Sequence, residues 1–322
     1  MSTYPLKFHP ILKERLWGGT KLKEVLGKPG KSDITGESWE LSAVDGDVSV
    51  VANGELSGTS LQELIDTHAD KLLGKSVIER FGDDFPILIK FIDAKQDLSI
   101  QLHPDDALAK ERHNSFGKTE MWYIMDADDD ANLIVGFNRD VTKETYSESL
   151  KNDTLLELLN YEKVKEGDTF FINTGKIHAI GAGVLLAEIQ QTSDITYRVF
   201  DFNRKDKDGN LRELHTEQAL DAIDYKRKDD FKVQYETQKD QVNDMVTCPY
   251  FTTNYLELTS NLDIPVEARD SFTIFMCVSG GAIIENEFGS VPIQKGETVL
   301  VAAASTRISI KTESAKLLEV TI

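Results

Sequence analysis

The segment from Gly167 to His178 constrains the fold more than any other, because it joins two predicted strands through a glycine turn. Residues 169–173 form a short apolar run, Gly175 permits a tight turn, and His178 begins the next apolar run. Similar short runs, separated by Gly, Asp and Asn, recur at residues 85–93, 98–103, 121–125, 133–137, 184–190 and 195–202. Short strands at such regular spacing predict a β-barrel or a β-sandwich.

Segments with a helical pattern interrupt the predicted strands at residues 60–73, 104–113, 142–159 and 216–223. In the first of them, apolar residues recur on one helical face, and Ser60 with Glu63 has the pattern of a capping box. Pro104 is expected at the start of the second helix. A boundary near residues 232–244 then divides the chain into two predicted domains, residues 1–240 and residues 241–322.

The C-terminal domain contains a faint repeat of the glycine-turn segment. The residues around Gly296 resemble those around Gly167, and carrying this alignment forward places Arg307 opposite His178. The second copy therefore has the same strand–turn–strand pattern without the histidine. Because a positive charge at that position disfavours a bound cation, we expect the C-terminal domain to be metal-free.

Charge and composition exclude several classes of partner. The chain has 322 residues and a formal net charge of −19, which argues against nucleic acid or an anionic membrane surface. No apolar run is long enough to span a membrane, and no apolar signal core follows Met1. Cys248 and Cys277 are too few for a disulfide framework. We therefore expect a cytoplasmic globular protein, a monomer or a weak homo-oligomer.

Four polar residues at predicted strand ends form a candidate metal site: Gln101, His103, Glu120 and His178. Alternation along a strand places Gln101 and His103 on one face. Two imidazoles, a carboxylate and an amide oxygen suit Zn²⁺, Mn²⁺, Fe²⁺ or Ni²⁺, and the lack of a thiol excludes a structural zinc finger. Lys118 and Arg198 flank the set with cations that could bind a phosphate.

Several of these stretches resemble known sequence motifs. The segment from Gly167 to His178 resembles the second motif of the cupin superfamily, with Asn173 where that motif has proline. Three further stretches resemble type I mannose-6-phosphate isomerases, also called phosphomannose isomerases: Gln101-Leu102-His103, residues 117–123, and residues 188–204. The resemblance runs from about residue 5 to residue 225, and the lack of a large helical insertion is typical of the short bacterial form.

This resemblance implies a mainly β protein with tandem cupin-like (jelly-roll) barrels and small helical insertions. It implies an aldose–ketose isomerase that interconverts mannose 6-phosphate and fructose 6-phosphate through an enediol, with one Zn²⁺ per chain. The implied metal ligands are Gln101, His103, Glu120 and His178. The implied catalytic residues are Arg198, Lys118 and Glu188, and the implied substrate-binding residues are Ser99, Lys118 and Arg198.

Some alternatives stay open at the level of the sequence. The proton that moves between C1 and C2 of the sugar could be carried by Glu188, Lys118, Glu37 or a histidine-bound water. Two other classes of protein also fit a metal-binding cupin: a metal-dependent oxygenase that uses Fe²⁺, and a non-enzymatic sugar-binding protein. An oxygenase would favour an apolar pocket without the Lys118 and Arg198 cations.

Overall fold

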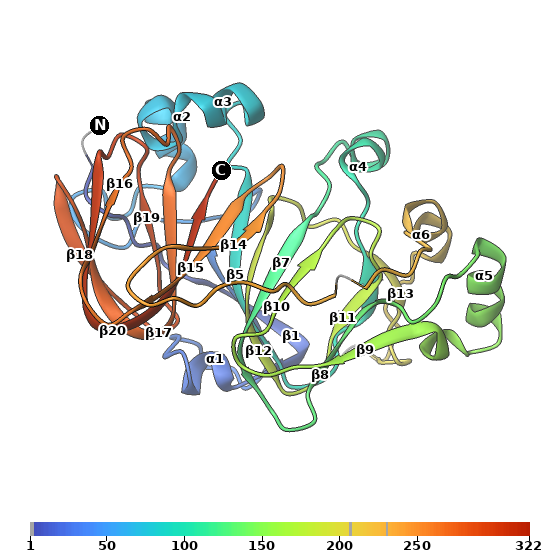
Figure 1. Cartoon of the computed structure of the whole chain (residues 1–322). Helices are drawn as coiled ribbons and strands as arrows, with labels where there is room; N and C mark the ends of the chain where they lie inside the picture. Colours follow the sequence, from blue (N-terminus) through green and yellow to red (C-terminus); the bar gives the residue numbers. More distant parts are fainter. Residues whose placement is uncertain (1–2, 206–207, 230) are drawn as a thin grey trace.

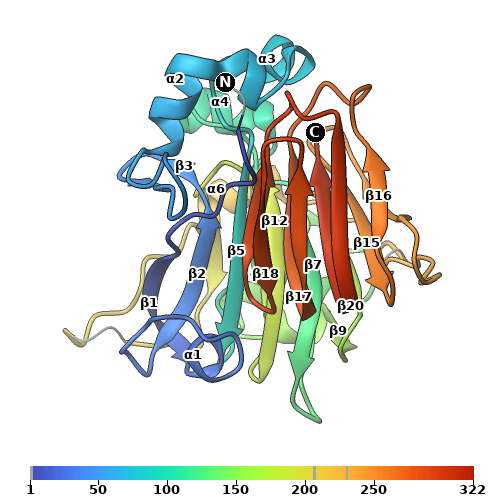
Figure 2. The same cartoon turned by 90° about the vertical axis from the view of Figure 1, so that its left-hand side faces the viewer.

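A computed structural model describes residues 3–205, 208–229 and 231–322, and it consists mainly of antiparallel strands (Figure 1). This confirms the predicted mainly β class with small helical insertions. The strands near the C-terminus form one end of the molecule, and the strands of the middle of the chain form the other (Figures 1 and 2). Three large sheets, described in turn below, build these parts.

The first two sheets hold the residues of the predicted site. A six-stranded sheet has the order β1 (Ile11–Gly19), β2 (Thr35–Leu41), β5 (Ile87–Ala94), β12 (Val184–Gln191), β7 (Glu120–Ala127) and β10 (Thr169–Ile172). A five-stranded sheet has the order β13 (Tyr197–Phe200), β6 (Ile100–Leu102), β11 (His178–Ile180), β8 (Asn132–Phe137) and β9 (Leu159–Lys163). A short hairpin pairs β3 (Ala43–Val44) with β4 (Asp47–Val48).

The third sheet comes from the C-terminal part of the chain. Its order is β14 (Asn243–Thr247), β15 (Thr252–Leu258), β20 (Arg307–Thr321), β17 (Thr273–Asn286) and β18 (Gly289–Gln294). Two shorter strands extend it, because β16 (Leu262–Pro265) pairs with β20 and β19 (Thr298–Val301) pairs with β17. One face of this sheet packs on the six-stranded sheet, in an apolar cluster that contains Ile89 and Met121 together with Ile274 and Leu318.

The central strands of the six-stranded sheet are buried on both faces, which explains their nearly continuous apolar sequences. On β7, Met121 and Tyr123 pack towards the C-terminal sheet, whereas Trp122 and Ile124 pack towards the five-stranded sheet. The same alternation applies to β5 and β12. By this alternation Lys90, Glu120 and Glu188 share the face of Trp122 and project between the first two sheets, where a site can form.

Six α-helices connect the described strands: α1 (Lys21–Glu24), α2 (Leu61–Leu72), α3 (Lys75–Phe81), α4 (Asp106–His113), α5 (Lys143–Lys151) and α6 (Thr216–Ala222). The capping box of Ser60 and Glu63 is present, as predicted. Pro104 does not open α4, because Asp105 supplies the N-cap by accepting a hydrogen bond from the Leu108 amide.

The predicted helix over residues 142–159 was wrong in its second half. Helix α5 ends at Lys151, where Asp153 adopts a left-handed conformation with φ of 55°. A short 3₁₀ segment follows at Leu155–Leu158, and Leu159 already begins β9. The apolar residues after Lys151 pack on the outer face of the five-stranded sheet rather than continuing one helical face.

The repeat expected from the sequence is present in the fold. Gly167 and Gly296 both adopt positive φ angles, 88° and 85°, which glycine tolerates. Strands β10 and β19 start two residues after these glycines, and β11 and β20 then start at His178 and Arg307. The side chain of Arg307 is exposed, so the C-terminal copy presents its cation to solvent.

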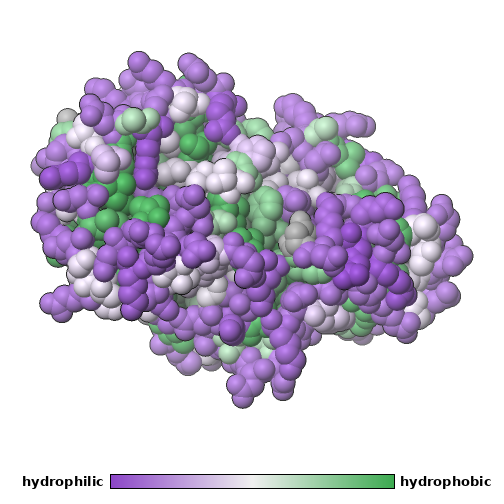
Figure 3. Space-filling model, viewed as in Figure 1, coloured by the Kyte–Doolittle hydropathy of each residue, from purple (hydrophilic) through white to green (hydrophobic). Residues whose placement is uncertain are grey.

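The surface agrees with the acidic, highly charged composition, since hydrophilic residues cover most of the face shown in Figure 3. None of the described helices is long and apolar enough to cross a membrane. Cys248 and Cys277 are both free thiols.

Candidate active site

Strand pairing brings the predicted metal ligands together from distant parts of the sequence. In the five-stranded sheet, Gln101 on β6 pairs with His178 on β11 and with Arg198 on β13. Glu120 begins β7 in the facing sheet, and His103 follows the end of β6. The two sheets therefore contribute opposite sides of a single site.

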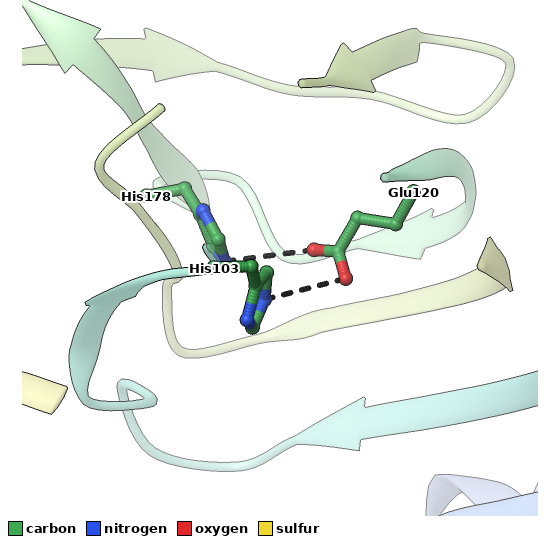
Figure 4. A group of neighbouring side chains, drawn as sticks. All are labelled: His103, Glu120 and His178. Carbon is green, nitrogen blue, oxygen red and sulfur yellow. Dashed lines mark ion pairs between the residues drawn. The ribbon is translucent and has the colours of Figure 1, made fainter. Parts of the chain in front are cut away.

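The side chains of His103, Glu120 and His178 converge in the buried space between the sheets (Figure 4). His103 Nε2 lies 3.5 Å from Glu120 Oε2, and His178 Nε2 lies 3.5 Å from Glu120 Oε1. Each of the three side chains is only 1% exposed. Within the described residues they form the only group of three or more His, Cys, Asp or Glu side chains with metal-binding spacing.

The hydrogen bond of Nδ1 in each imidazole fixes which ring nitrogen carries the proton. His103 Nδ1 lies 2.8 Å from the carbonyl oxygen of Ile195, and His178 Nδ1 lies 2.8 Å from that of Lys176. A carbonyl oxygen can only accept a hydrogen bond, so each Nδ1 donates and each neutral ring points the lone pair of Nε2 at Glu120. Such hydrogen bonds orient metal-binding histidines.

Two atoms of this triad have no hydrogen-bond partner among the described residues, His103 Nε2 and Glu120 Oε2. Buried polar atoms are normally paired, and imidazole nitrogens that carry only lone pairs cannot donate to the ionised form of Glu120. A divalent cation between them would satisfy all three groups, so the residues fit a metal.

Gln101 stands at the edge of the triad rather than inside it. Its Nε2 lies 3.5 Å from His178 Nε2, and its Oε1 accepts a hydrogen bond of 3.3 Å from Ser99 Oγ. A half-turn of the amide group would exchange its nitrogen and oxygen and offer an acceptor to a cation. Among the four predicted ligands, Gln101 is the one that is only half-buried.

Burial determines the protonation of the triad. Desolvation, reinforced by the positive charge of Lys118, holds the pKa of His103 well below its usual value of 6.5. Desolvation also lowers the pKa of His178 to about 4. For Glu120, desolvation and then repulsion by Glu188 raise the pKa to about 8, against the attraction of Lys118 and Lys90. Without a metal, neutral histidines thus face a protonated Glu120 at pH 7.

A cavity of about 450 Å³ opens beside the triad, and it is lined by Gln101 and Lys118, which lie next to His178 and Glu120. Of the residues predicted from the sequence, Ser99, Gln101, Lys118 and Arg198 line it, whereas His103, Glu120, His178 and Glu188 do not. Lys118 reaches furthest towards the triad, with Nζ 3.6 Å from Glu120 Oε2. The cavity is polar and cationic, which suits an anionic sugar and not the apolar pocket expected for an oxygenase.

Glu188 is buried behind the cavity wall and is held by one ion pair and one hydrogen bond. Lys90 Nζ lies 3.0 Å from its Oε1, and the Trp122 indole donates a hydrogen bond of 2.9 Å to its Oε2. Desolvation would raise the pKa of Glu188, but the charges of Lys90 and Lys118 outweigh it and lower that pKa. Glu188 is therefore a carboxylate fixed in its ionised form.

Glu37 also lines the cavity, but its carboxylate already accepts several hydrogen bonds from neighbouring side chains. Both of its oxygens bind the Arg15 guanidinium at 3.1 Å, and the Trp39 indole donates to it at 2.6 Å. Burial would raise the pKa of Glu37, but Lys90 and Arg15 together lower it. A carboxylate with so many donors is a weak base.

Sequence reasoning missed three cations that line the cavity: Arg15, Lys90 and Arg212. Lys90 did leave a signal in the sequence, because it is a charged residue in the middle of the apolar run of β5. Arg15 and Arg212 lie in segments of mixed polarity that no spacing rule distinguishes from ordinary surface.

Two family models match this chain. The model described as "Phosphomannose isomerase type I, catalytic domain" matches residues 6–130, and that described as "Mannose-6-phosphate isomerase, cupin domain" matches residues 241–321. Among individual relatives, a mannose-6-phosphate isomerase of Bacillus subtilis is 39% identical over 308 residues, which span 94% of each chain. A mannose-6-phosphate isomerase of Streptococcus mutans is 34% identical and spans 92% of each chain.

A solved structure gives the same result for the fold. The crystal structure of the mannose 6-phosphate isomerase from Bacillus subtilis superimposes with a TM-score of 0.90 and 32% sequence identity. The match covers 99% of this chain and 100% of that one, so it includes both the site and the C-terminal sheet.

Proposed function

The chain belongs to the type I phosphomannose isomerase family, and from this premise we propose that it interconverts mannose 6-phosphate and fructose 6-phosphate in the cavity beside the triad. The observation that carries the proposal is the buried group of His103, Glu120 and His178, with its unpartnered polar atoms, beside a cationic cavity. The substrate is thus a sugar phosphate rather than a macromolecule, and the cytoplasm is the compartment we propose.

We assign one Zn²⁺ per chain to His103, Glu120 and His178, with Gln101 as the fourth ligand. When bound, a divalent cation would stabilise negative charge that develops on the sugar oxygens during formation of the enediol. The contribution of the chain is to hold two neutral imidazoles with fixed lone pairs and one carboxylate, away from bulk water. We further propose that residues 1–240 form the catalytic domain and that residues 241–322 form a degenerate cupin-like domain.

The proton transfer between C1 and C2 requires a group that reaches the cavity. Glu188 is held by Lys90 and the Trp122 indole, and Glu37 is saturated by donors, so these two carboxylates are the weaker candidates. Lys118 lines the cavity, and its Nζ lies 3.6 Å from Glu120 Oε2 at the triad, where C1 and C2 would lie; a water held by the histidines is the other candidate. We therefore assign Lys118 to the reacting end, Glu188 to fixing Lys90, and Ser99 with Arg198 to substrate binding.

A coupled assay with mannose 6-phosphate tests the proposal. Chelated protein should be inactive, and Zn²⁺ should restore turnover. His178→Ala should lose both metal and activity, since it removes a ligand, whereas the matched control His9→Ala, at an exposed histidine, should keep both. Full turnover by metal-free protein would refute the assignment of the site. Oxygen uptake in place of isomerisation would favour the oxygenase alternative.

A further inference from the structure

Arg212 lies beside Arg198 although the two residues belong to different segments. The segment that returns after β13 is fastened to that strand, because Arg198 Nη1 donates to the Glu213 carbonyl at 2.9 Å and the His215 amide donates to the Arg198 carbonyl at 2.7 Å. Arg212 directly precedes this contact, and both guanidinium-bearing residues line the cavity.

Their charges are less neutralised than those of the other cavity cations. Lys118, Lys90 and Arg15 each face a carboxylate, those of Glu120, Glu188 and Glu37 respectively. Within the described part of the chain, by contrast, Arg198 makes no ion pair, and its bonds go to the Glu213 carbonyl and to Ser99 Oγ.

Among the described residues, Arg212 has a single carboxylate partner, Asp201, which also pairs with Arg204. Asp201 binds Arg204 at 2.6 Å and Arg212 at 3.4 Å, so the shorter pairing goes to Arg204. The Arg212 side chain is 26% exposed, and Arg204 does not line the cavity. Desolvation and then the charge of Arg212 lower the pKa of Arg198, as expected for two guanidinium groups that line one cavity. An anion between them would relieve the repulsion of these like charges.

Polar groups follow one another outwards along a single wall of the cavity. Gln101 contacts His178, Ser99 contacts Gln101, and Arg198 contacts Ser99, while Arg212 lines the same cavity close enough for its charge to act on Arg198. In mannose 6-phosphate the phosphate is at the opposite end of the carbon chain from C1 and C2. If C1 and C2 lie at the triad, the phosphate therefore lies towards the outer end of this wall.

We propose that Arg212 and Arg198 together form the phosphate-recognition end of the cavity, whereas Lys118 serves the reacting end. This inference rests on the proposed function, because it places the reacting carbons at the triad. Two planar guanidinium groups can donate several charge-assisted hydrogen bonds to a phosphate dianion. They give this strongly acidic protein the local positive charge that an anionic substrate needs.

Steady-state kinetics of Arg212→Gln with mannose 6-phosphate test the inference. Loss of a charge-assisted contact made equally in ground and transition states should raise KM by about 10- to 100-fold and leave kcat nearly unchanged. Arg212→Lys, which keeps the charge but loses the planar fork, should give an intermediate KM. Calorimetric titration with inorganic phosphate should show a parallel loss of affinity, and it does not depend on turnover.

Arg204→Gln is the matched control, since it removes the other partner of Asp201 without removing a cavity residue. Its KM and phosphate affinity should stay close to those of the wild type. The inference would be overturned if Arg212→Gln had the same KM and phosphate affinity as the wild type, or if it had a lower kcat at unchanged KM. An effect of Arg204→Gln as large as that of Arg212→Gln would also overturn it. Inactive wild-type protein would count against the proposed function instead, and the phosphate titration would still test Arg212.

Discussion

Binding of Zn²⁺ to metal-free protein should release about one proton per chain at pH 7, and that proton should come from Glu120. With a pKa of about 8, Glu120 is about 90% protonated at pH 7 and about 10% protonated at pH 9, and it must ionise to bind a metal. His178, with a pKa of about 4, is already neutral at pH 7, and the pKa of His103 is lowered in the same direction. The release should therefore fall from about 0.9 to about 0.1 proton between pH 7 and pH 9.

Lower pH separates this site from one with ordinary pKa values. At pH 5 the buried site should still release only about one proton, because Glu120 is protonated and His178 is about 90% neutral. With ordinary pKa values of about 6.5 for histidine and about 4.3 for glutamate, the same ligands would release about two protons at pH 5 and none at pH 9. The two cases thus differ in the direction of the change as well as in its size.

Isothermal titration calorimetry in buffers of different ionisation enthalpy measures the number of protons released. Glu120→Gln is the control, because its amide cannot ionise, and the difference between wild type and variant at each pH gives the share of Glu120. A release that rises to two protons at pH 5, or one that is the same in Glu120→Gln, would refute the reasoning about burial.

Three further predictions concern the scaffold. Lys90→Met should lower the free energy of unfolding by about 3–5 kcal/mol in urea, since it leaves Glu188 buried and unpaired, and adding Glu188→Gln should recover much of that loss. Gly175→Ala should destabilise the protein by more than about 1 kcal/mol and weaken metal binding, because a Cβ there would lie 2.6 Å from a backbone carbonyl oxygen. Gly46→Ala is its control, because Gly46 has the same φ of 78° but no atom of the described residues near its Cβ position, so the difference between the two variants measures the effect of the clash. Arg307→Ala should leave one metal per chain by elemental analysis, and a second equivalent bound by the unaltered protein would contradict a metal-free C-terminal domain.

The central strands were predictable because burial on both faces leaves a strong signal. Strands β5, β7 and β12 are apolar along most of their length, and Lys90, Glu120 and Glu188 in them mark the face of the site. Strands β1 and β2 were missed because charged residues such as Glu14, Arg15 and Glu37 interrupt their apolar pattern. Arg15 and Glu37 pair with each other at the cavity, and such a tertiary contact cannot be read from local periodicity.

The metal-site residues were predictable because histidine and glutamate stand next to turns and strand ends in the sequence. The other residues of the site were less predictable. His178 after the Gly175 turn, and His103 with Glu120 at strand ends, indicated a metal site, and the fold brings these three together. The sequence could not show that Glu188 lies behind the cavity wall, because its depth depends on the pairing with Lys90 and Trp122. It also could not indicate Arg212, which reaches the cavity only because the segment after β13 folds back along that strand.

The most direct test of the central claim is to follow mannose 6-phosphate by NMR in the presence of the zinc-loaded protein. We expect fructose 6-phosphate to form until equilibrium is reached, and we expect no conversion by chelated protein or by His178→Ala. Absence of fructose 6-phosphate with the zinc-loaded wild type, or its formation at an undiminished rate without His178, would contradict the account.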